Sequence, residues 1–126
     1  ILLPGDIERA GEAAVVLEIS APYDVVIAPH HGSRTSSGRR LIRATDPDYV
    51  VFSAAPGNRW NFPHAEVMAR WARGGACLLN TATDGAIAFH TAGGRLRVRE
   101  RARIDRRRLW RLRWAEASAC QGRENL

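Results

Sequence analysis

The chain has 126 residues, a formal net charge of +6 and 45% hydrophobic residues. This length allows one globular domain at most, and the apolar content is ordinary for such a domain. The longest apolar runs are far shorter than the roughly 20 residues that a membrane-spanning helix needs, and no segment with the pattern of a secretory signal opens the sequence. Because the sequence starts at Ile1 inside an apolar stretch and without methionine, we expect it to be part of a longer protein.

The positive charge is concentrated near the end of the chain. Residues 1–94 carry 8 Arg and 9 acidic residues, whereas residues 95–113 carry 10 Arg with Glu100 and Asp105. Every basic side chain is Arg, whose planar fork suits phosphate. Exclusive use of Arg can equally reflect genome composition, and we favour that explanation. Cys77 and Cys120 lack metal-ligand spacing, and Cys77 is expected to be a buried apolar side chain.

Strand and helix patterns alternate along the first 90 residues. A strand end at 1–3 precedes a helix with helically spaced apolar residues, and uninterrupted apolar runs predict buried strands. Ser37 can cap the second helix, Pro63 suits the first position of the third, and Asp84-Gly85 is a turn signal. The expected strands are 1–3, 23–28, 49–53, 77–79 and 86–89, and the expected helices are 8–19, 39–44 and 64–73.

Beyond Gly93-Gly94 the pattern changes. From Arg95 to Ile104, arginines alternate with apolar residues, which predicts a strand with one solvent-exposed face and one packed face. A last helix is expected from Asp105 to about Ala117. We therefore divide the chain into residues 1–90 and an Arg-rich strand and helix at 91–126. Alternating strands and helices indicate an α/β fold, in which functional residues gather on loops beyond the strand ends.

Asp6, His30 and His31 occupy such loops. A carboxylate at Asp6 can coordinate or bridge divalent ions, or it can cap the following helix, and on its own the cap is the more frequent role. Of the adjacent histidines, one can bind a metal while the other contacts a carboxylate or substrate, or both can be plain loop residues. Gly32 allows a sharp turn after them.

A second polar loop runs from Asn58 to His64. Asn58, Arg59 and Trp60 can contact phosphate or stack on a base, although an ordered surface loop is the simpler reading. His64 lies where a helix begins, so it can assist anion binding there or be merely exposed.

Four segments, read in order, carry a family resemblance. They are Leu2-Leu3-Pro4-Gly5-Asp6, Ala28-Pro29-His30-His31-Gly32-Ser33, Asn58-Arg59-Trp60-Asn61-Phe62-Pro63-His64 and Thr83-Asp84-Gly85-Ala86-Ile87. Together they resemble the last half of the metallo-β-lactamase-like domain of ComEC-type DNA-internalisation competence proteins. The resemblance covers about residues 1–90 and implies the C-terminal half of a metallo-β-lactamase-like αββα sandwich, with one apolar sheet face lacking its cover.

The resemblance also implies roles for the loop residues. Asp6 matches the aspartate that bridges two metals, His31 matches the late histidine ligand, and His30 is then a neighbour or an alternative ligand. Ser33, Asn58, Arg59 and His64 are the candidate substrate-binding residues, although Phe62 stands where many relatives carry another histidine. The main metal cluster of the superfamily, a His-x-His/Asp-x-Asp-His motif, is absent from the sequence.

The implied function is a part in DNA uptake, with metal-dependent hydrolysis of DNA phosphodiesters in the full-length protein. The cofactor implied is a divalent metal, Zn²⁺ or Mn²⁺, held by the complete domain, and this chain alone is expected to be inactive and to hold no metal pair. The implied partners are DNA, the N-terminal half of the same domain and the membrane channel of the parent protein. That parent is expected in the bacterial inner membrane, with this domain outside the membrane and the chain itself soluble. The alternative is a non-catalytic, Arg-rich module that binds nucleic acid or an acidic surface.

Overall fold

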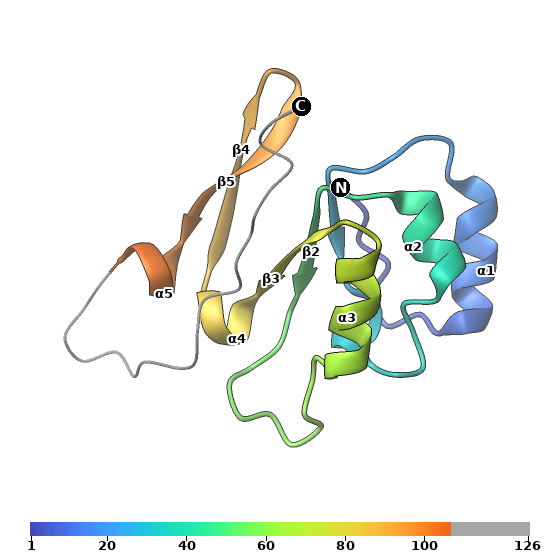
Figure 1. Ribbon diagram of the computed structural model, residues 1–126, viewed down its shortest axis with the longest axis horizontal. Coiled ribbons are helices and arrows are strands. Elements are labelled where there is room, and N and C mark those ends of the chain that lie inside the picture. Colours follow the sequence, from blue (N-terminus) through green and yellow to red (C-terminus); the bar gives the residue numbers. More distant parts are fainter. Residues whose placement is uncertain (107–126) are drawn as a thin grey trace.

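The computed structural model describes residues 1–106, which are built around a small parallel sheet (Figure 1). The sheet has the order β1 (Val25–Ile27), β2 (Tyr49–Phe52), β3 (Cys77–Asn80), and Val26, Val50 and Leu78 lie side by side in register. Leu2 extends it by a parallel bridge to Val26. The remaining elements are α1 (Arg9–Glu18), the 3₁₀ turn η1 (Pro29–Gly32), α2 (Arg39–Thr45), α3 (Ala65–Arg73), α4 (Thr81–Asp84), β4 (Ile87–Ala92), β5 (Arg95–Arg101) and α5 (Ala102–Asp105).

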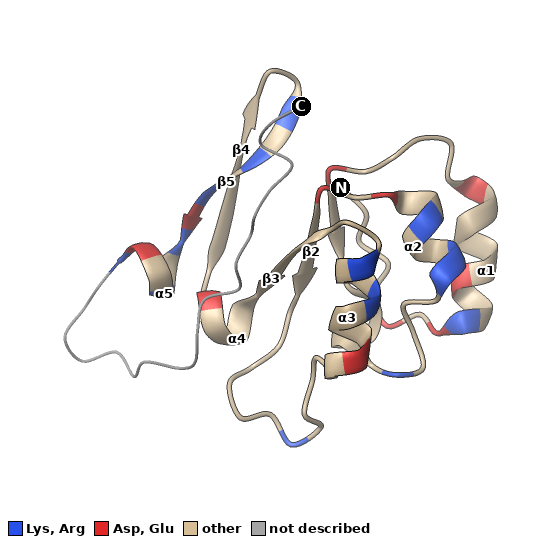
Figure 2. Cartoon of the chain, viewed as in Figure 1, with Lys and Arg blue, Asp and Glu red and all other residues tan. Residues whose placement is uncertain are grey.

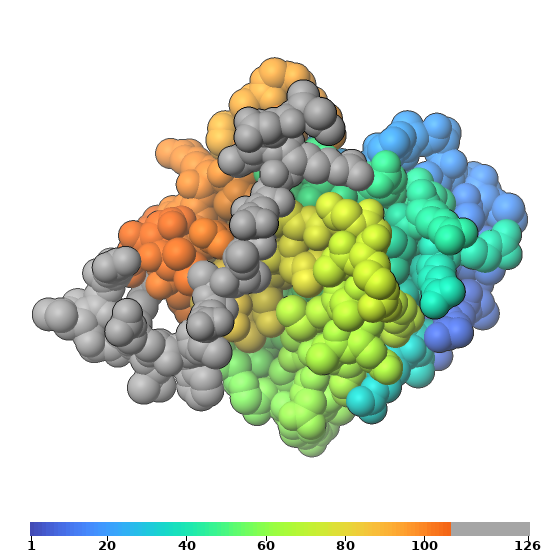
Figure 3. Space-filling model, in the orientation of Figure 1, coloured from blue at the N-terminus to red at the C-terminus, as the bar shows by residue number. Residues whose placement is uncertain are grey.

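One face of the sheet packs against α2 and α3. Val26, Val50 and Phe52 point to this face and form a buried cluster with Ile42, Val67 and Trp71 from the two helices. In the space-filling view α2 and α3 lie next to each other on the same side of the molecule (Figure 3). The adjacent helix α1 packs against α2 and contributes no side chain to this cluster.

The other face of the sheet is covered by the β4–β5 hairpin. Leu79 and Tyr49 are buried on this face, and Phe89, Leu96 and Val98 of the hairpin pack against their cluster. Our expectation of an uncovered apolar face was therefore wrong. The alternation in β5 supplies the cover, because its apolar residues turn toward the sheet, as the period of two predicts.

The α/β class is confirmed, with differences in detail. The hairpin spans the expected boundary at residue 90, since β4 and β5 pair antiparallel through Phe89–Val98 and Ala92–Arg95. Pro63 follows a cis peptide bond and α3 begins two residues later, at Ala65. Most of the helix expected from Asp105 to Ala117 lies outside the described residues. Within residues 1–106, no helix combines the length and the apolar character that crossing a membrane requires.

The free backbone amides at the start of α2 donate hydrogen bonds to Glu12, and Ser37 is not the cap. The N-cap of α2 is Gly38, and the carboxylate of Glu12 in α1 accepts hydrogen bonds from the backbone amides of Ser37 and Gly38. Glu12 is only 4% exposed. A carboxylate from a neighbouring helix thus takes the place of the local cap that the sequence suggested, since it accepts bonds from donors that the helix leaves unpaired.

We expect Glu12→Ala to destabilise the protein by about 1–3 kcal/mol, because the backbone amides of Ser37 and Gly38 lose their buried hydrogen-bond acceptor. Urea unfolding followed by circular dichroism measures this loss. Glu18→Ala at the exposed end of the same helix is the matched control and should change the free energy of unfolding by less than about 0.5 kcal/mol. Equal effects of the two changes would show that Glu12 does not hold α1 against α2.

Candidate metal and substrate site

The loops that follow Leu2, β1 and β2 meet at the carboxyl end of the sheet. Asp6 follows the bridge at Leu2, His30 and His31 follow β1, and the loop with Trp60 and Phe62 follows β2. In Figure 1 the long loop between β2 and α3 lies below this end of the sheet. Parallel strands bring their carboxyl ends to one edge, which is why residues far apart in sequence share a site.

The backbone between β1 and α2 turns through an uncommon conformation. His30 and His31 have φ values of 48° and 55°, and Gly32 follows with 88°. Left-handed φ values at consecutive non-glycine residues are unfavourable and persist where the surrounding structure enforces them, often at functional sites. At Gly32 a Cβ atom would lie 2.6 Å from Cβ of Pro63, so only glycine fits between the turn and the next loop.

Hydrogen bonding fixes which nitrogen of His31 is free. Its Nδ1 lies 2.8 Å from the carbonyl oxygen of Ser53, just after β2. A carbonyl oxygen only accepts, so Nδ1 carries a proton, and in the neutral form of the ring the lone pair is on Nε2. This is the arrangement typical of metal-binding histidines, in which a backbone carbonyl orients the ring and leaves the other nitrogen to bind.

The free nitrogen of His31 points toward Asp6. Nε2 lies 3.5 Å from Oδ1 of Asp6, and both side chains are accessible, with exposed fractions of 46% and 67%. This separation is long for a hydrogen bond. Two ligand atoms on one tetrahedral zinc ion lie about 3.4 Å apart, given bonds near 2.1 Å. The pair therefore has the spacing of two ligands of one ion, and Asp6 does not cap α1, whose N-cap is Glu8.

His30 has a different neighbour. Its Nδ1 lies 3.6 Å from Oε1 of Glu8, and that same oxygen accepts a hydrogen bond of 2.9 Å from the hydroxyl of Thr35. The adjacent histidines thus face separate carboxylates, His31 toward Asp6 and His30 toward Glu8. His30 therefore does not share the carboxylate that His31 faces.

Aromatic side chains form one wall of the site. The ring of Phe62 stacks on His31 with centroids 6.3 Å apart and meets His30 edge to face at 5.8 Å. Trp60 stacks on the outer side of Phe62 and is itself 56% exposed. A cavity of about 460 Å³ lies between this wall, Asp6, the two histidines and Ser53.

The four candidate substrate residues differ in their placement. Asn58 lines the cavity, but its side chain bonds to the backbone of Ala55 and Phe62 and so shapes the loop. Arg59 lies over the ring of Trp60, 4.3 Å from its centroid. Ser33 is buried, and its hydroxyl forms a hydrogen bond with the hydroxyl of Thr35. The ring of His64 packs edge to face on Phe62. Neither residue lines the cavity.

Sequence reasoning missed Glu8, Ser53 and the stacking role of Phe62. Glu8 carried a weak signal as an acidic residue close to Asp6. Ser53 contacts His31 through its backbone carbonyl, which every residue type has, so the sequence gives no sign of this contact.

The described residues bring together two side chains that could bind a metal ion. Asp6 and His31 present donors suited to Zn²⁺ or Mn²⁺. Among residues 1–106 no group of three or more His, Cys, Asp or Glu side chains is placed to hold one ion. A four-coordinate shell therefore needs ligands beyond those that the described part of the chain provides.

Comparison with known proteins links the chain to competence proteins. It is 33% identical to Recombination protein 2 of Haemophilus influenzae over 79% of its length. It is also 33% identical to ComE operon protein 3 of Bacillus subtilis over 70%, and 31% identical to Competence protein ComA of Neisseria gonorrhoeae over 82%. The chain spans only 12–15% of the length of these relatives. No family model matches the chain, and no solved structure matches it.

Proposed function

We propose that this chain is the C-terminal half of a metallo-β-lactamase-like domain in a competence-type protein that takes up DNA. The relatives named for competence and recombination support the role in DNA uptake. The observation that carries the chemical part is the Asp6–His31 pair, with its 3.5 Å separation and its oriented imidazole. On this proposal the domain works with DNA, with its own N-terminal half and with the membrane channel of an inner-membrane protein, on the outer side of that membrane.

The reaction that this site fits is hydrolysis of DNA phosphodiesters. A divalent ion in the complete domain would supply Lewis-acid chemistry at a phosphate oxygen. Asp6 and His31 would hold that ion together with ligands from the N-terminal half. Ser53 would keep the His31 ring in place through its carbonyl, and Glu8 would orient His30. The exposed ring of Trp60 offers a surface on which a base could stack.

We expect the 126-residue chain alone not to hydrolyse DNA in the presence of Mn²⁺ or Zn²⁺, because Asp6 and His31 are fewer ligands than either ion prefers. Conversion of supercoiled plasmid to the nicked form measures this. Asp6→Ala protein purified in parallel is the control for contaminating nucleases. Nicking by the original chain that is lost in Asp6→Ala would contradict the assignment of this chain as half of a site.

A further inference from the structure

The near-neutral charge of residues 1–94 hides a strongly uneven distribution in space. Of its eight arginines, all but Arg59 line two pockets on the side of the sheet that carries the helices. The larger pocket is lined by Arg9, Arg34, Arg39, Arg40 and Arg70, and the smaller by Arg39, Arg70, Arg43 and Arg73. Figure 2 shows basic residues on α1, α2 and α3 accordingly.

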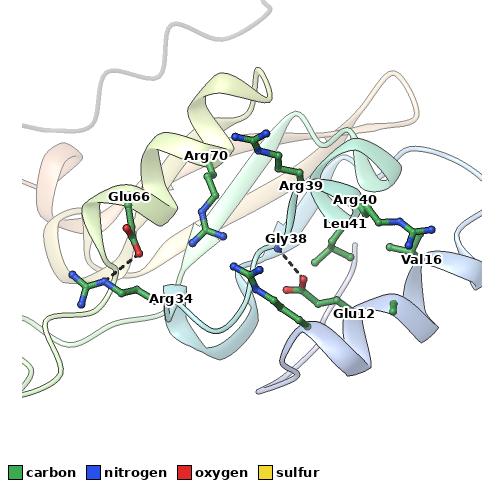
Figure 4. A pocket seen from close by; sticks show the side chains of 11 residues that line it. Glu12, Val16, Arg34, Gly38, Arg39, Arg40, Leu41, Glu66 and Arg70 are labelled. Carbon is green, nitrogen blue, oxygen red and sulfur yellow. Dashed lines mark hydrogen bonds and ion pairs between the residues drawn. The ribbon is translucent and has the colours of Figure 1, made fainter.

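The two pockets are neighbours, and we call them together the arginine groove. They share Arg39 and Arg70, and their volumes are about 540 and 280 Å³. Figure 4 shows the larger one, with Arg39 and Arg40 extending from α2, Arg70 from α3 and Arg34 from the segment before α2. Apolar Val16 and Leu41 also line it, so the charges surround a concave surface.

Both acidic residues of the groove are already engaged. Glu12 is buried and accepts from the backbone before α2, and Glu66 pairs with Arg34 at 3.1 Å. Arg70 donates to the carbonyl oxygens of Ser36 and Ser37 at 3.1 and 2.9 Å.

The arginines that α2 contributes are by contrast available. The exposed side chains of Arg39, Arg40 and Arg43 make no hydrogen bond or ion pair with any part of the chain that the structure describes. Their charge is therefore not neutralised within residues 1–106, which suits binding of an external anion.

The arginine groove adjoins the Asp6–His31 site. Arg34 lines the groove, and the next residue, Thr35, donates to Glu8, which faces His30 in the site. Arg9 lines the groove directly after Glu8 in the chain. An extended ligand could thus contact both places, with Glu8 at the boundary between them.

We propose that the arginine groove binds the phosphate backbone of a single DNA strand whose neighbouring segment reaches the Asp6–His31 site. The proposal rests on the proposed function for the identity of the polymer. Guanidinium groups bind phosphate oxygens in a bidentate way, and a positively charged groove that follows the backbone is typical of proteins that bind single strands. A strand can enter concave pockets, whereas a bilayer contacts protruding surface.

The test is the salt dependence of binding of a fluorescent oligothymidine strand to the chain in EDTA. The double variant Arg39→Gln and Arg43→Gln should bind more weakly. Its slope of log affinity against log salt should fall by about 1.4, since each phosphate contact on a single strand contributes about 0.7. The matched control is Arg97→Gln with Arg99→Gln on β5, which removes the same charge from the opposite side of the sheet and should leave the slope unchanged.

Three results would overturn the proposal. They are an unchanged slope in the α2 variant, an equal fall in the β5 control, and tighter binding to phosphatidylserine vesicles than to the strand. The variant Arg39→Lys and Arg43→Lys keeps the charge and should keep most of the slope, which separates a binding defect from misfolding. Because binding is measured in EDTA, with no divalent ion present, a failure of the arginine groove is distinguished from a failure of the metal site.

Discussion

Replacing Asp6 with Ala in the complete domain should reduce metal-dependent DNA hydrolysis by more than about 100-fold, beyond the 10–100-fold typical when only a supporting neighbour of a metal ligand is lost. Asp6 presents an exposed carboxylate 3.5 Å from the free nitrogen of His31. On the proposed function, this change removes one of the two metal ligands that residues 1–106 offer, and no group of three or more possible ligands exists among those residues to replace it. Initial rates of plasmid nicking in Mn²⁺ measure the effect.

His64→Ala is the matched comparison for Asp6→Ala. His64 touches the edge of Phe62 at 5.4 Å between centroids and does not line the cavity. Its loss should therefore lower the rate only mildly, and His30→Ala should fall between the two, about 10-fold, as expected for a supporting neighbour. Equal, mild losses for Asp6 and His64 would mean that Asp6 is an ordinary loop residue.

Trp71→Ala should destabilise the protein by about 3–5 kcal/mol, the usual cost of removing a large buried aromatic side chain. Trp71 is fully buried at the centre of the cluster between α3 and the sheet. Urea unfolding measures the decrease in the free energy of unfolding. It is followed by far-ultraviolet circular dichroism, which does not rely on the fluorescence of the tryptophan that is removed. Trp60→Ala is the control, because Trp60 is 56% exposed and its removal leaves no cavity in the core. Similar losses for both would contradict the core assignment.

The elements of the parallel sheet could be predicted because their signals are local. Val25-Val26-Ile27 and Tyr49-Val50-Val51-Phe52 are uninterrupted apolar runs, and both form buried strands. The alternation in β5 predicted its two faces, and Leu96 and Val98 do pack inward. Arg95, on the solvent-exposed face of β5, forms ion pairs with Asp24 and Asp48 at 3.4 and 2.6 Å. These two partners lie 71 and 47 residues away in the sequence, respectively, and leave no local signal.

The sequence pointed to several residues around one cavity but not to the contacts among them. Motif order pointed to Asp6, His30 and His31, which the structure brings to one cavity. The pairing of His30 with Glu8 and the cap that Glu12 gives to α2 depend on how α1 packs, which no periodicity encodes. The arginine groove escaped notice for the same reason, since its arginines come from separate helices and their charge cancels in a count along the chain.

Reconstitution of the domain from its two halves would show whether Asp6 and His31 belong to a shared metal site. The chain is mixed with the N-terminal half of the domain from its parent protein, and nicking of plasmid DNA is measured with Mn²⁺ or Zn²⁺. We expect hydrolysis only when both halves and the ion are present, and we expect it to be lost when the chain carries Asp6→Ala or His31→Ala. Undiminished hydrolysis by the Asp6→Ala mixture, or none by the unaltered complete domain with either ion, would contradict this expectation.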